Sequence, residues 1–293
     1  MKSKYIHLFF SSLCYFVTWC LSGCLFLTFC IIIIMTACEE KIDWDYSENN
    51  LKIMAVESII TNENKKHTVK LTLVRINPNQ DALPVTDAIV RVSLAGNNYE
   101  FEHDPLNPGC YLSKHPFIDV IGTLVNLHII HDGIEYSGSD NMIPVSPMLR
   151  ASFRKLDNED MYEIIHSSSV FNSNEQAMWE IFIDWSFLPE YQNIEPDSCK
   201  ARLFFYDLKN IDVGQIFSPP KKPLKFPKGA QVSQSKYSLS NEHAEFRRSL
   251  LLETEWRGGM FDVSPGMVYT NIDNDAVGFF GASSVIRDSF YIE

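Results

Sequence analysis

Apolar side chains recur at every second position over residues 51–142, and this period constrains the fold more than any other feature of the sequence. The runs 69–73, 90–94 and 125–129 each alternate Val, Leu or Ile with mostly polar residues. A two-residue period places one face of a segment in a core and the other in water, as in antiparallel sheets. The pattern predicts a mainly β fold, with no helix before residue 150.

Turn-forming residues separate these runs at regular intervals. Ala95-Gly96-Asn97-Asn98, Pro108-Gly109 and Asp132-Gly133 each stand between two apolar segments. Asp-Gly is a strong hairpin signal because both residues tolerate a positive φ. Short strands at this spacing are typical of a sandwich. We therefore predict an immunoglobulin-like or transthyretin-like β-sandwich domain over residues 51–145.

The second half of the chain combines strand patterns with one helix. Residues 179–185 alternate aromatic or Ile side chains with other residues. Residues 277–285 are expected to form a terminal strand whose glycines allow close backbone approach. Near 240–257, Ser240 is the expected N-cap and Gly258-Gly259 the expected stop. Residues 146–293 are thus predicted to form a second β-rich domain with one short helix.

A loop rich in proline and lysine lies inside this second domain. Four prolines between Ser218 and Gly229 exclude a helix or an interior strand. The loop concentrates positive charge around an aromatic residue on an acidic chain, and its members are Lys221, Lys222, Lys225, Phe226 and Lys228. It is a candidate docking loop for a partner with acidic loops. A solvated connection is the alternative.

The N-terminal segment indicates export. Lys2 and Lys4 precede an apolar run from Ile6 to Ala37, which ends in small residues before Cys38. This order is typical of an export signal, and a cysteine after the small residues is similar to a bacterial lipobox. We predict a signal peptide over 1–37, a lipid such as palmitate attached at Cys38, and a tether over 38–50.

Two alternatives to this anchor stay open. Leu21-Ser22-Gly23-Cys24 also has the spelling of a lipobox, but cleavage there would leave the apolar residues 25–37 on the mature chain. The run is also long enough to span a bilayer as an uncleaved helix, which needs roughly 20 apolar residues. Polarity changes sharply at Glu39, which favours Cys38.

Charge excludes one class of partner. The full chain has a formal charge of −12, and loss of Lys2 and Lys4 with the signal leaves 23 basic residues against 37 acidic ones, or −14. Nucleic acid requires a basic footprint, so it is not expected as a partner. Docking on anionic lipid by charge is disfavoured for the same reason, and the acyl chains would supply attachment.

Two cysteines remain in the predicted mature body. Cys110 and Cys199 fall in different predicted domains, and an exported protein permits a disulfide between them. Two free thiols are the alternative that we favour, because disulfide geometry is demanding. Neither cysteine has a Cys or His at metal-site spacing.

No local pattern indicates catalysis or a cofactor. Asn271-x-Asp273-x-Asp275 starts like a calcium loop but lacks its later Gly and Glu, so a polar turn is expected. His128 and His131 are three residues apart, which on a strand points them to opposite faces. Hydrolase motifs and phosphate loops are missing. We assign no catalytic residue, no metal and no cofactor beyond the lipid on Cys38.

Several segments in order resemble one family, the Bacteroidetes lipoproteins with the domain of unknown function 4249. The segments that carry the resemblance are Cys38-Glu39-Glu40, Leu51–Glu57, Ile59–Thr61, His67–Leu71, Pro84-Val85, Asp87–Val90, Pro108–Tyr111, Pro265–Ile272 and Val277–Phe280. Cys110 and the Pro/Lys loop have no place in the family pattern. The resemblance implies an outer-membrane lipoprotein often found with TonB-dependent transporters, and it implies no reaction.

The expected function follows from the anchor and the resemblance together. We expect a lipid-anchored outer-membrane protein that binds rather than catalyses, as an accessory to a TonB-dependent transporter in nutrient uptake. Glu39-Glu40 resembles the acidic signals that send such lipoproteins to the cell surface. The alternatives are a surface structural or adhesion module without a transport role, and an enzyme whose separated catalytic residues leave no local signature.

Overall fold

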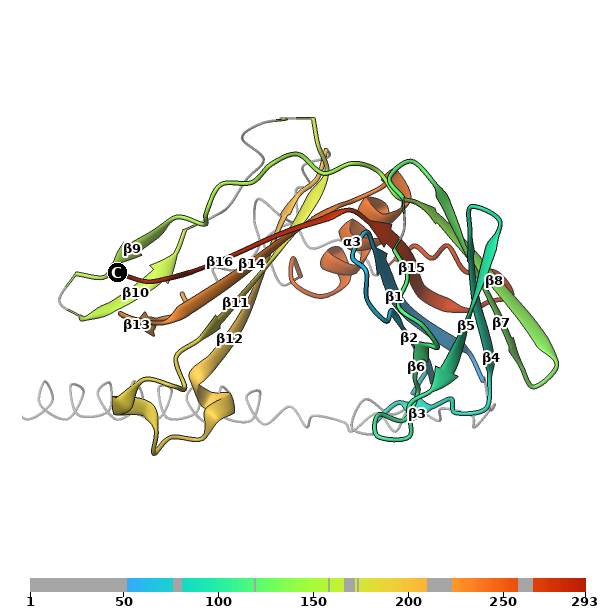
Figure 1. Cartoon of the computed structure of the whole chain (residues 1–293), viewed down its shortest axis with the longest axis horizontal. Helices are drawn as coiled ribbons and strands as arrows, with labels where there is room; N and C mark the ends of the chain where they lie inside the picture. Colours follow the sequence, from blue (N-terminus) through green and yellow to red (C-terminus); the bar gives the residue numbers. More distant parts are fainter. Residues whose placement is uncertain are drawn as a thin grey trace, which may run out of the picture. The chain divides into compact units, whose positions relative to one another are not determined.

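The computed structural model describes residues 52–75, 81–118, 120–157, 159–165, 172, 174–209, 223–257 and 266–293 (Figure 1). Within these ranges the protein is mainly β, as the alternation predicted, with the single α-helix α3 (Asn241–Glu253). The strands form three sheets. None of the helices described there has the length and apolarity to cross a bilayer.

The largest sheet has nine strands, in the order β15-β1-β2-β6-β5-β4-β7-β8, with β3 paired to β2. Its members are β1 (Met54–Thr61), β2 (Thr68–Leu73), β3 (Leu83–Pro84), β4 (Ile89–Leu94), β5 (Asn97–His103), β6 (Cys110–Ser113), β7 (Leu124–His131), β8 (Ile134–Asn141) and β15 (Val277–Ser283). All pairings are antiparallel except that of β1 with β15.

The alternating residues of this sheet converge on one apolar core. Val69, Val92 and Leu127 belong to β2, β4 and β7, and all three are buried in that core. Their strand neighbours at odd offsets point to solvent, which confirms the period read from the sequence. The Asp132-Gly133 hairpin also forms, with φ of 51° and 76° at its two residues.

β15 and β8, which stand at the two ends of the sheet order, meet. Gly138 of β8 bridges Ile272, just before β15, and Asp140 of β8 accepts a hydrogen bond from the Ala282 backbone N–H of β15 at 2.8 Å. The sheet therefore nearly closes around its core. The expected close approach at the terminal glycines occurs at Gly278, where φ is 95° and a Cβ would overlap the Val56 carbonyl oxygen.

Two smaller sheets complete the described structure. The four-stranded sheet has the order β12-β11-β14-β16, and the three-stranded sheet has the order β13-β10-β9. The elements are β9 (Phe153–Lys155), β10 (Met161–Ile164), β11 (Ala177–Asp184), the 3₁₀ turns η1 (Pro189–Tyr191) and η2 (Pro196–Cys199), β12 (Lys200–Asp207), β13 (Phe226–Pro227), β14 (Gln231–Ser238) and β16 (Val285–Tyr291). Their shared core contains Ile181, Val232 and Phe290.

The C-terminal segment belongs to both larger sheets. It forms β15 in the nine-stranded sheet, passes Ser284, and continues as β16 in the four-stranded sheet, visible as the red end of the chain (Figure 1). The sequence predicted one terminal strand here, not two. The nine-stranded sheet thus includes a strand from beyond residue 145, where the first predicted domain ends.

Helix α3 begins where the sequence predicts. Ser240 is the N-cap, and its Oγ accepts a hydrogen bond from the His243 backbone N–H at 3.0 Å. The helix ends at Glu253 rather than near 257, because the chain leaves helical geometry at Thr254. The Thr254 hydroxyl donates to the Leu250 carbonyl at 2.7 Å. Gly258 and Gly259, the predicted stop, lie outside the described residues.

Candidate functional site

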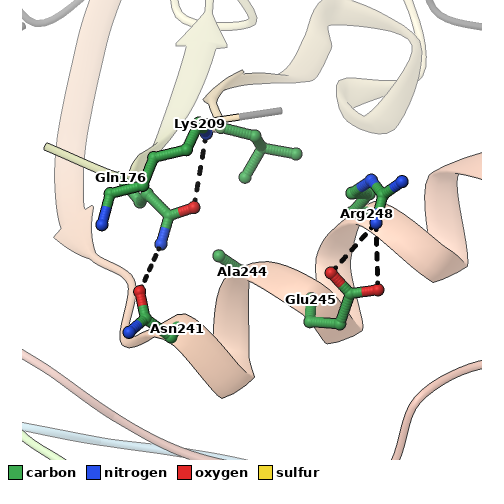
Figure 2. A pocket seen from close by; sticks show the side chains of 7 residues that line it. Gln176, Lys209, Asn241, Ala244, Glu245 and Arg248 are labelled. Carbon is green, nitrogen blue, oxygen red and sulfur yellow. Dashed lines mark hydrogen bonds and ion pairs between the residues drawn. The ribbon is translucent and has the colours of Figure 1, made fainter. Parts of the chain in front are cut away.

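A recess of about 250 Å³ lies beside the first turns of α3 (Figure 2). Asn241, Ala244, Glu245 and Arg248 line it from one face of the helix, at the spacing that puts residues on the same side. Gln176, before β11, and Leu208 and Lys209, after β12, form the opposite wall.

Hydrogen bonds organise this recess. Gln176 donates to Asn241 at 3.1 Å and accepts from the Lys209 backbone N–H at 3.3 Å. Arg248 Nη1 donates to both Glu245 oxygens at 3.1 Å. The lining offers amide, ammonium, guanidinium and carboxylate groups but no Ser, Cys or His. The recess thus presents hydrogen-bonding and charged groups beside the apolar side chains of Leu208 and Ala244.

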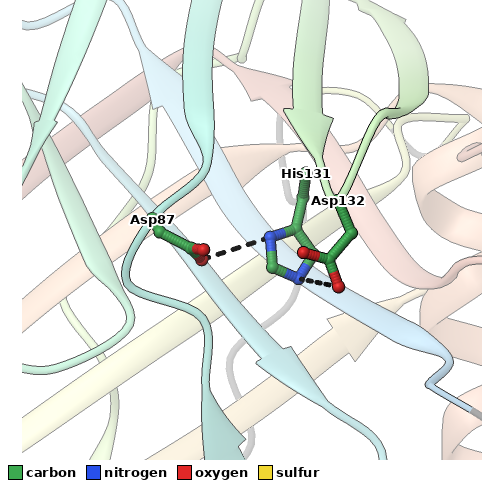
Figure 3. A group of neighbouring side chains, drawn as sticks. All are labelled: Asp87, His131 and Asp132. Carbon is green, nitrogen blue, oxygen red and sulfur yellow. Dashed lines mark ion pairs between the residues drawn. The ribbon is translucent and has the colours of Figure 1, made fainter.

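A second cluster stands at the turn between β7 and β8 (Figure 3). His131 Nδ1 lies 3.2 Å from Asp87 Oδ1, and His131 Nε2 lies 3.9 Å from Asp132 Oδ2. The His131 side chain is 13% exposed, whereas those of Asp87 and Asp132 are 72% and 51% exposed. Lys52 approaches the same turn, with Nζ 3.2 Å from Asp132 Oδ2.

Sequence reasoning missed this cluster because its members come from two segments more than forty residues apart in the sequence. Asp87 precedes β4, and His131 and Asp132 follow Ile130 of β7. The antiparallel register pairs Ile89 with Ile130 and so brings the start of β4 beside the end of β7. The matching alternation of 90–94 and 125–129 was the available signal, but alternation alone does not reveal which strands pair.

Buried polar groups gather where α3 meets β15. His243 is fully buried, stacks on Phe279 and has Nε2 3.3 Å from the donor Nε of Arg247. Burial lowers the pKa of His243 well below its ordinary value, and the Arg247 charge adds to that shift. Because Nε2 accepts from Arg247, the neutral ring carries its proton on Nδ1, 3.5 Å from Ser283 Oγ. His243 therefore cannot take a proton from Ser283, and this pair is structural.

Asp140 lies in the same buried region. Burial raises its pKa to about 6, against the opposing effect of hydrogen bonds from Ser240 and from the backbone of Ala282 and Asn141. These contacts of Asp140 do not include a nucleophile paired with a histidine or lysine that could act as its base. Asp140 instead links β8 to β15 in the nine-stranded sheet.

A buried ion pair ties residue 146 to the four-stranded sheet. Lys236 Nζ lies 2.6 Å from Glu175 Oε2, donates to Ser146 Oγ at 2.8 Å and stands over the ring of Trp179. Burial pushes the pKa of Glu175 upward, but the hydrogen bonds from Lys236 and Ser146 outweigh burial and lower it. These contacts fix Ser146 against the four-stranded sheet.

The Pro/Lys segment differs from the predicted exposed loop. Phe226 is fully buried in the core of the smaller sheets, and Phe226-Pro227 forms β13 by pairing with β10. Pro227 is tolerated because β13 is an edge strand. Phe226 is therefore not available to a partner. Lys225 and Lys228 are exposed, and Lys225 binds Glu159 at 2.8 Å.

Several other predicted residues can be placed. Cys110 lies in β6 and Cys199 in η2, and both are free thiols, so the possible disulfide is not formed. Cys110 belongs to the nine-stranded sheet, whereas Cys199 lies just before β12 of the four-stranded sheet. Cys38, Cys24, Lys221 and Lys222, the signal peptide and the whole tether lie outside the described residues.

The acidic segment after Asn271 forms a polar turn, as predicted, and its side chains hydrogen-bond to neighbouring strands. Asp273 accepts from the backbone N–H and hydroxyl of Ser137 in β8. Asn271 donates to the Ser139 and Phe280 carbonyls and accepts from the Phe280 N–H. Its oxygens and amides thus link β8 to β15.

Comparison with known proteins gives one informative result. Residues 39–289 match the family model described as "Domain of unknown function (DUF4249)". No curated protein matches the chain.

Proposed function

The chain belongs to the DUF4249 family, and from this premise we propose that it is a lipid-anchored outer-membrane binding protein of the Bacteroidetes type, accessory to a TonB-dependent transporter in nutrient uptake. The proposal depends most on one observation: the family match starts where the predicted signal peptide and lipid-bearing cysteine end. The family match begins at residue 39, directly after Cys38. The apolar segment before it thus lies outside the family domain, as expected of a signal removed at Cys38 rather than at Cys24.

The length of the tether supports action close to the membrane. Thirteen residues separate Cys38 from Lys52, where the described structure begins. Such a segment spans at most about 45 Å when fully extended. A body held that close to a membrane is concentrated near other proteins in the same membrane, which raises weak binding without any new contact. Two or more acyl chains would make the attachment stable.

The finer fold belongs to this proposal as well. We infer an immunoglobulin-like or transthyretin-like sandwich in the first half of the body. Its support is the almost wholly antiparallel pairing of β1 to β8 and the single apolar cluster that these strands enclose. Loops of such a sandwich, together with the recess beside α3, are the surfaces that the proposal assigns to a nutrient or a transporter.

Processing at Cys38 is tested with two matched cysteine variants in the native host. We expect Cys24→Ser to leave the mature mass and outer-membrane location unchanged, and Cys38→Ser to accumulate with residues 1–37 still attached. Mass spectrometry of the N-terminal peptide measures both. The reverse pattern would place the lipid on Cys24, and unchanged retention of the apolar segment in wild type would show an uncleaved helix.

Transport partnership is tested by extraction of the native protein in a mild detergent. We expect a TonB-dependent transporter, identified by mass spectrometry, to co-purify with wild type and not with Cys38→Ser. Deletion should slow growth on at least one nutrient. A pure monomer from the outer membrane, with normal growth of the deletion strain on every nutrient, would sink the transport role and support the adhesion module.

A further inference from the structure

Three potential ligands for a metal ion meet at one end of the nine-stranded sheet. One ring nitrogen of His131 and one oxygen each from Asp87 and Asp132 lie within 4.8 Å of one another (Figure 3). His131 and Asp132 are consecutive, whereas Asp87 comes from the loop before β4. The set joins two loops that the antiparallel register already holds side by side.

The contact between His131 and Asp87 has the geometry of two ligands of one ion. Nδ1 and Oδ1 are 3.2 Å apart, yet His131 Nδ1 is buried and makes no hydrogen bond. At that distance the oxygen must lie off the axis along which a ring N–H would donate. Two atoms each about 2.1 Å from one metal, at about 90–109° to each other, are about 3.0–3.4 Å apart and off axis in this way.

Exposure leaves room for further ligands. His131 is nearly buried, which fixes its ring, while both carboxylates open to solvent. Water or a carboxylate or hydroxyl group of another molecule can therefore complete the coordination. We propose that Asp87, His131 and Asp132 bind a divalent transition-metal ion of the Zn²⁺ class. An imidazole nitrogen favours such ions over Ca²⁺, which prefers six to eight oxygen ligands.

Lys52 supplies an internal competitor that makes the proposal specific. Its ammonium lies 3.2 Å from Asp132 Oδ2, so its positive charge opposes a second cation at the same carboxylate. Removing the lysine charge should strengthen metal binding. Adventitious binding by an isolated surface histidine would not respond to Lys52.

The test uses the full-length protein in detergent micelles, stripped with a chelator and titrated with Zn²⁺ by calorimetry. We expect one saturable site that Ca²⁺ does not fill. His131→Gln should weaken Zn²⁺ binding at least about 100-fold, since loss of an outer partner of a ligand alone costs about 10–100-fold. Lys52→Gln should tighten it. His128→Gln is the matched control, because His128 lies on the same strand and pairs only with Glu135 among the contacts described here.

A second readout is independent of affinity. Co²⁺ bound at this site should give visible absorption bands that are present in His128→Gln and lost in Asp87→Asn, a variant that keeps the size of the side chain. Circular dichroism checks that each variant is folded. Saturable binding that survives both His131→Gln and Asp87→Asn, equal filling by Ca²⁺, or no binding by wild type would overturn the proposal.

Discussion

Lys236 and Glu175 show what a buried charge requires. Their side chains are 0% and 5% exposed, so each depends on its partner and on Ser146 for the contacts that water would otherwise supply. Lys225 and Glu159 form a pair of the same type at 43% and 46% exposure. Water screens the second pair, and the two should differ greatly in their effect on stability.

We predict that Lys236→Met lowers the free energy of unfolding by about 3–5 kcal/mol, because it removes the ammonium that lies 2.6 Å from the buried Glu175 carboxylate. Lys225→Met is the control and should change stability by less than about 1 kcal/mol. Urea denaturation of both variants measures the difference. Equal losses of stability in the two variants would show that the buried pair matters no more to the folded state than the exposed pair.

Asp140 should give stability an unusual pH dependence. Its folded pKa of about 6 exceeds the ordinary 3.8 because burial disfavours the charge. From pH 3.8 to about 6 the folded state keeps a proton that the unfolded state has released. This contribution is therefore complete below 3.8, decreases as the pH rises, and is absent above about 6.

The Asp140→Asn variant isolates this effect, since an amide oxygen can still accept from Ala282. We expect the stability of wild type relative to the variant to fall by about 3 kcal/mol between pH 3.8 and 6, from a shift of about two pKa units. Urea titrations at a series of pH values give the difference curve. A flat curve, or one that rises with pH, would contradict the prediction. Glu63, whose hydrogen bond to Arg287 lowers its pKa to about 2, titrates in both proteins and cancels.

Among the elements, β15 most depends on a single residue. It runs parallel to β1, and Gly278 faces Val56 so closely that no side chain fits. Gly133, in the β7–β8 hairpin, also has a positive φ of 76° but stands in open space. The two glycines separate the cost of backbone conformation from the cost of a steric clash.

Gly278→Ala should lower the free energy of unfolding by at least about 3 kcal/mol, because a strained backbone and an overlap with Val56 act together. Gly133→Ala should cost only about 1 kcal/mol, from conformation alone. The midpoints of urea unfolding compare the two. A milder effect at Gly278 would mean that β1 and β15 separate easily.

Local patterns predicted some elements well and others poorly. The alternation in β2, β4 and β7 and the side-chain oxygen of Ser240 act within a few residues, so the strands and the start of α3 were predictable. Burial of Phe226 was not, since it depends on pairing with Tyr162 of β10, more than sixty residues away.

At the scale of the whole molecule, the C-terminal segment contributes strands to sheets in both of the predicted domains. The described residues between 52 and 293 form one compact unit. Phe280 and Ala282 of β15 belong to the core of the first eight strands, and Ile272 fills it from the preceding loop. The first half alone would leave this core open and one edge of β1 unpaired.

We predict that a fragment of residues 51–145 does not fold on its own. Joining residues 266–284 to it through a flexible linker should restore a cooperative unfolding transition. Circular dichroism and urea denaturation distinguish the fragment from the linked form. A cooperative transition in the shorter fragment would instead support an independent domain that ends at residue 145.

The sequence by itself determined where most strands lie, where α3 begins and which residues suit an export signal and lipid anchor. Each of these depends on side chains close together along the chain. Only the tertiary structure decided that β15 and β8 meet, that Phe226 is buried and that Asp87 reaches His131 and Asp132. These contacts join residues far apart in sequence, and a local period records which face of a strand is buried but not which strand lies beside it.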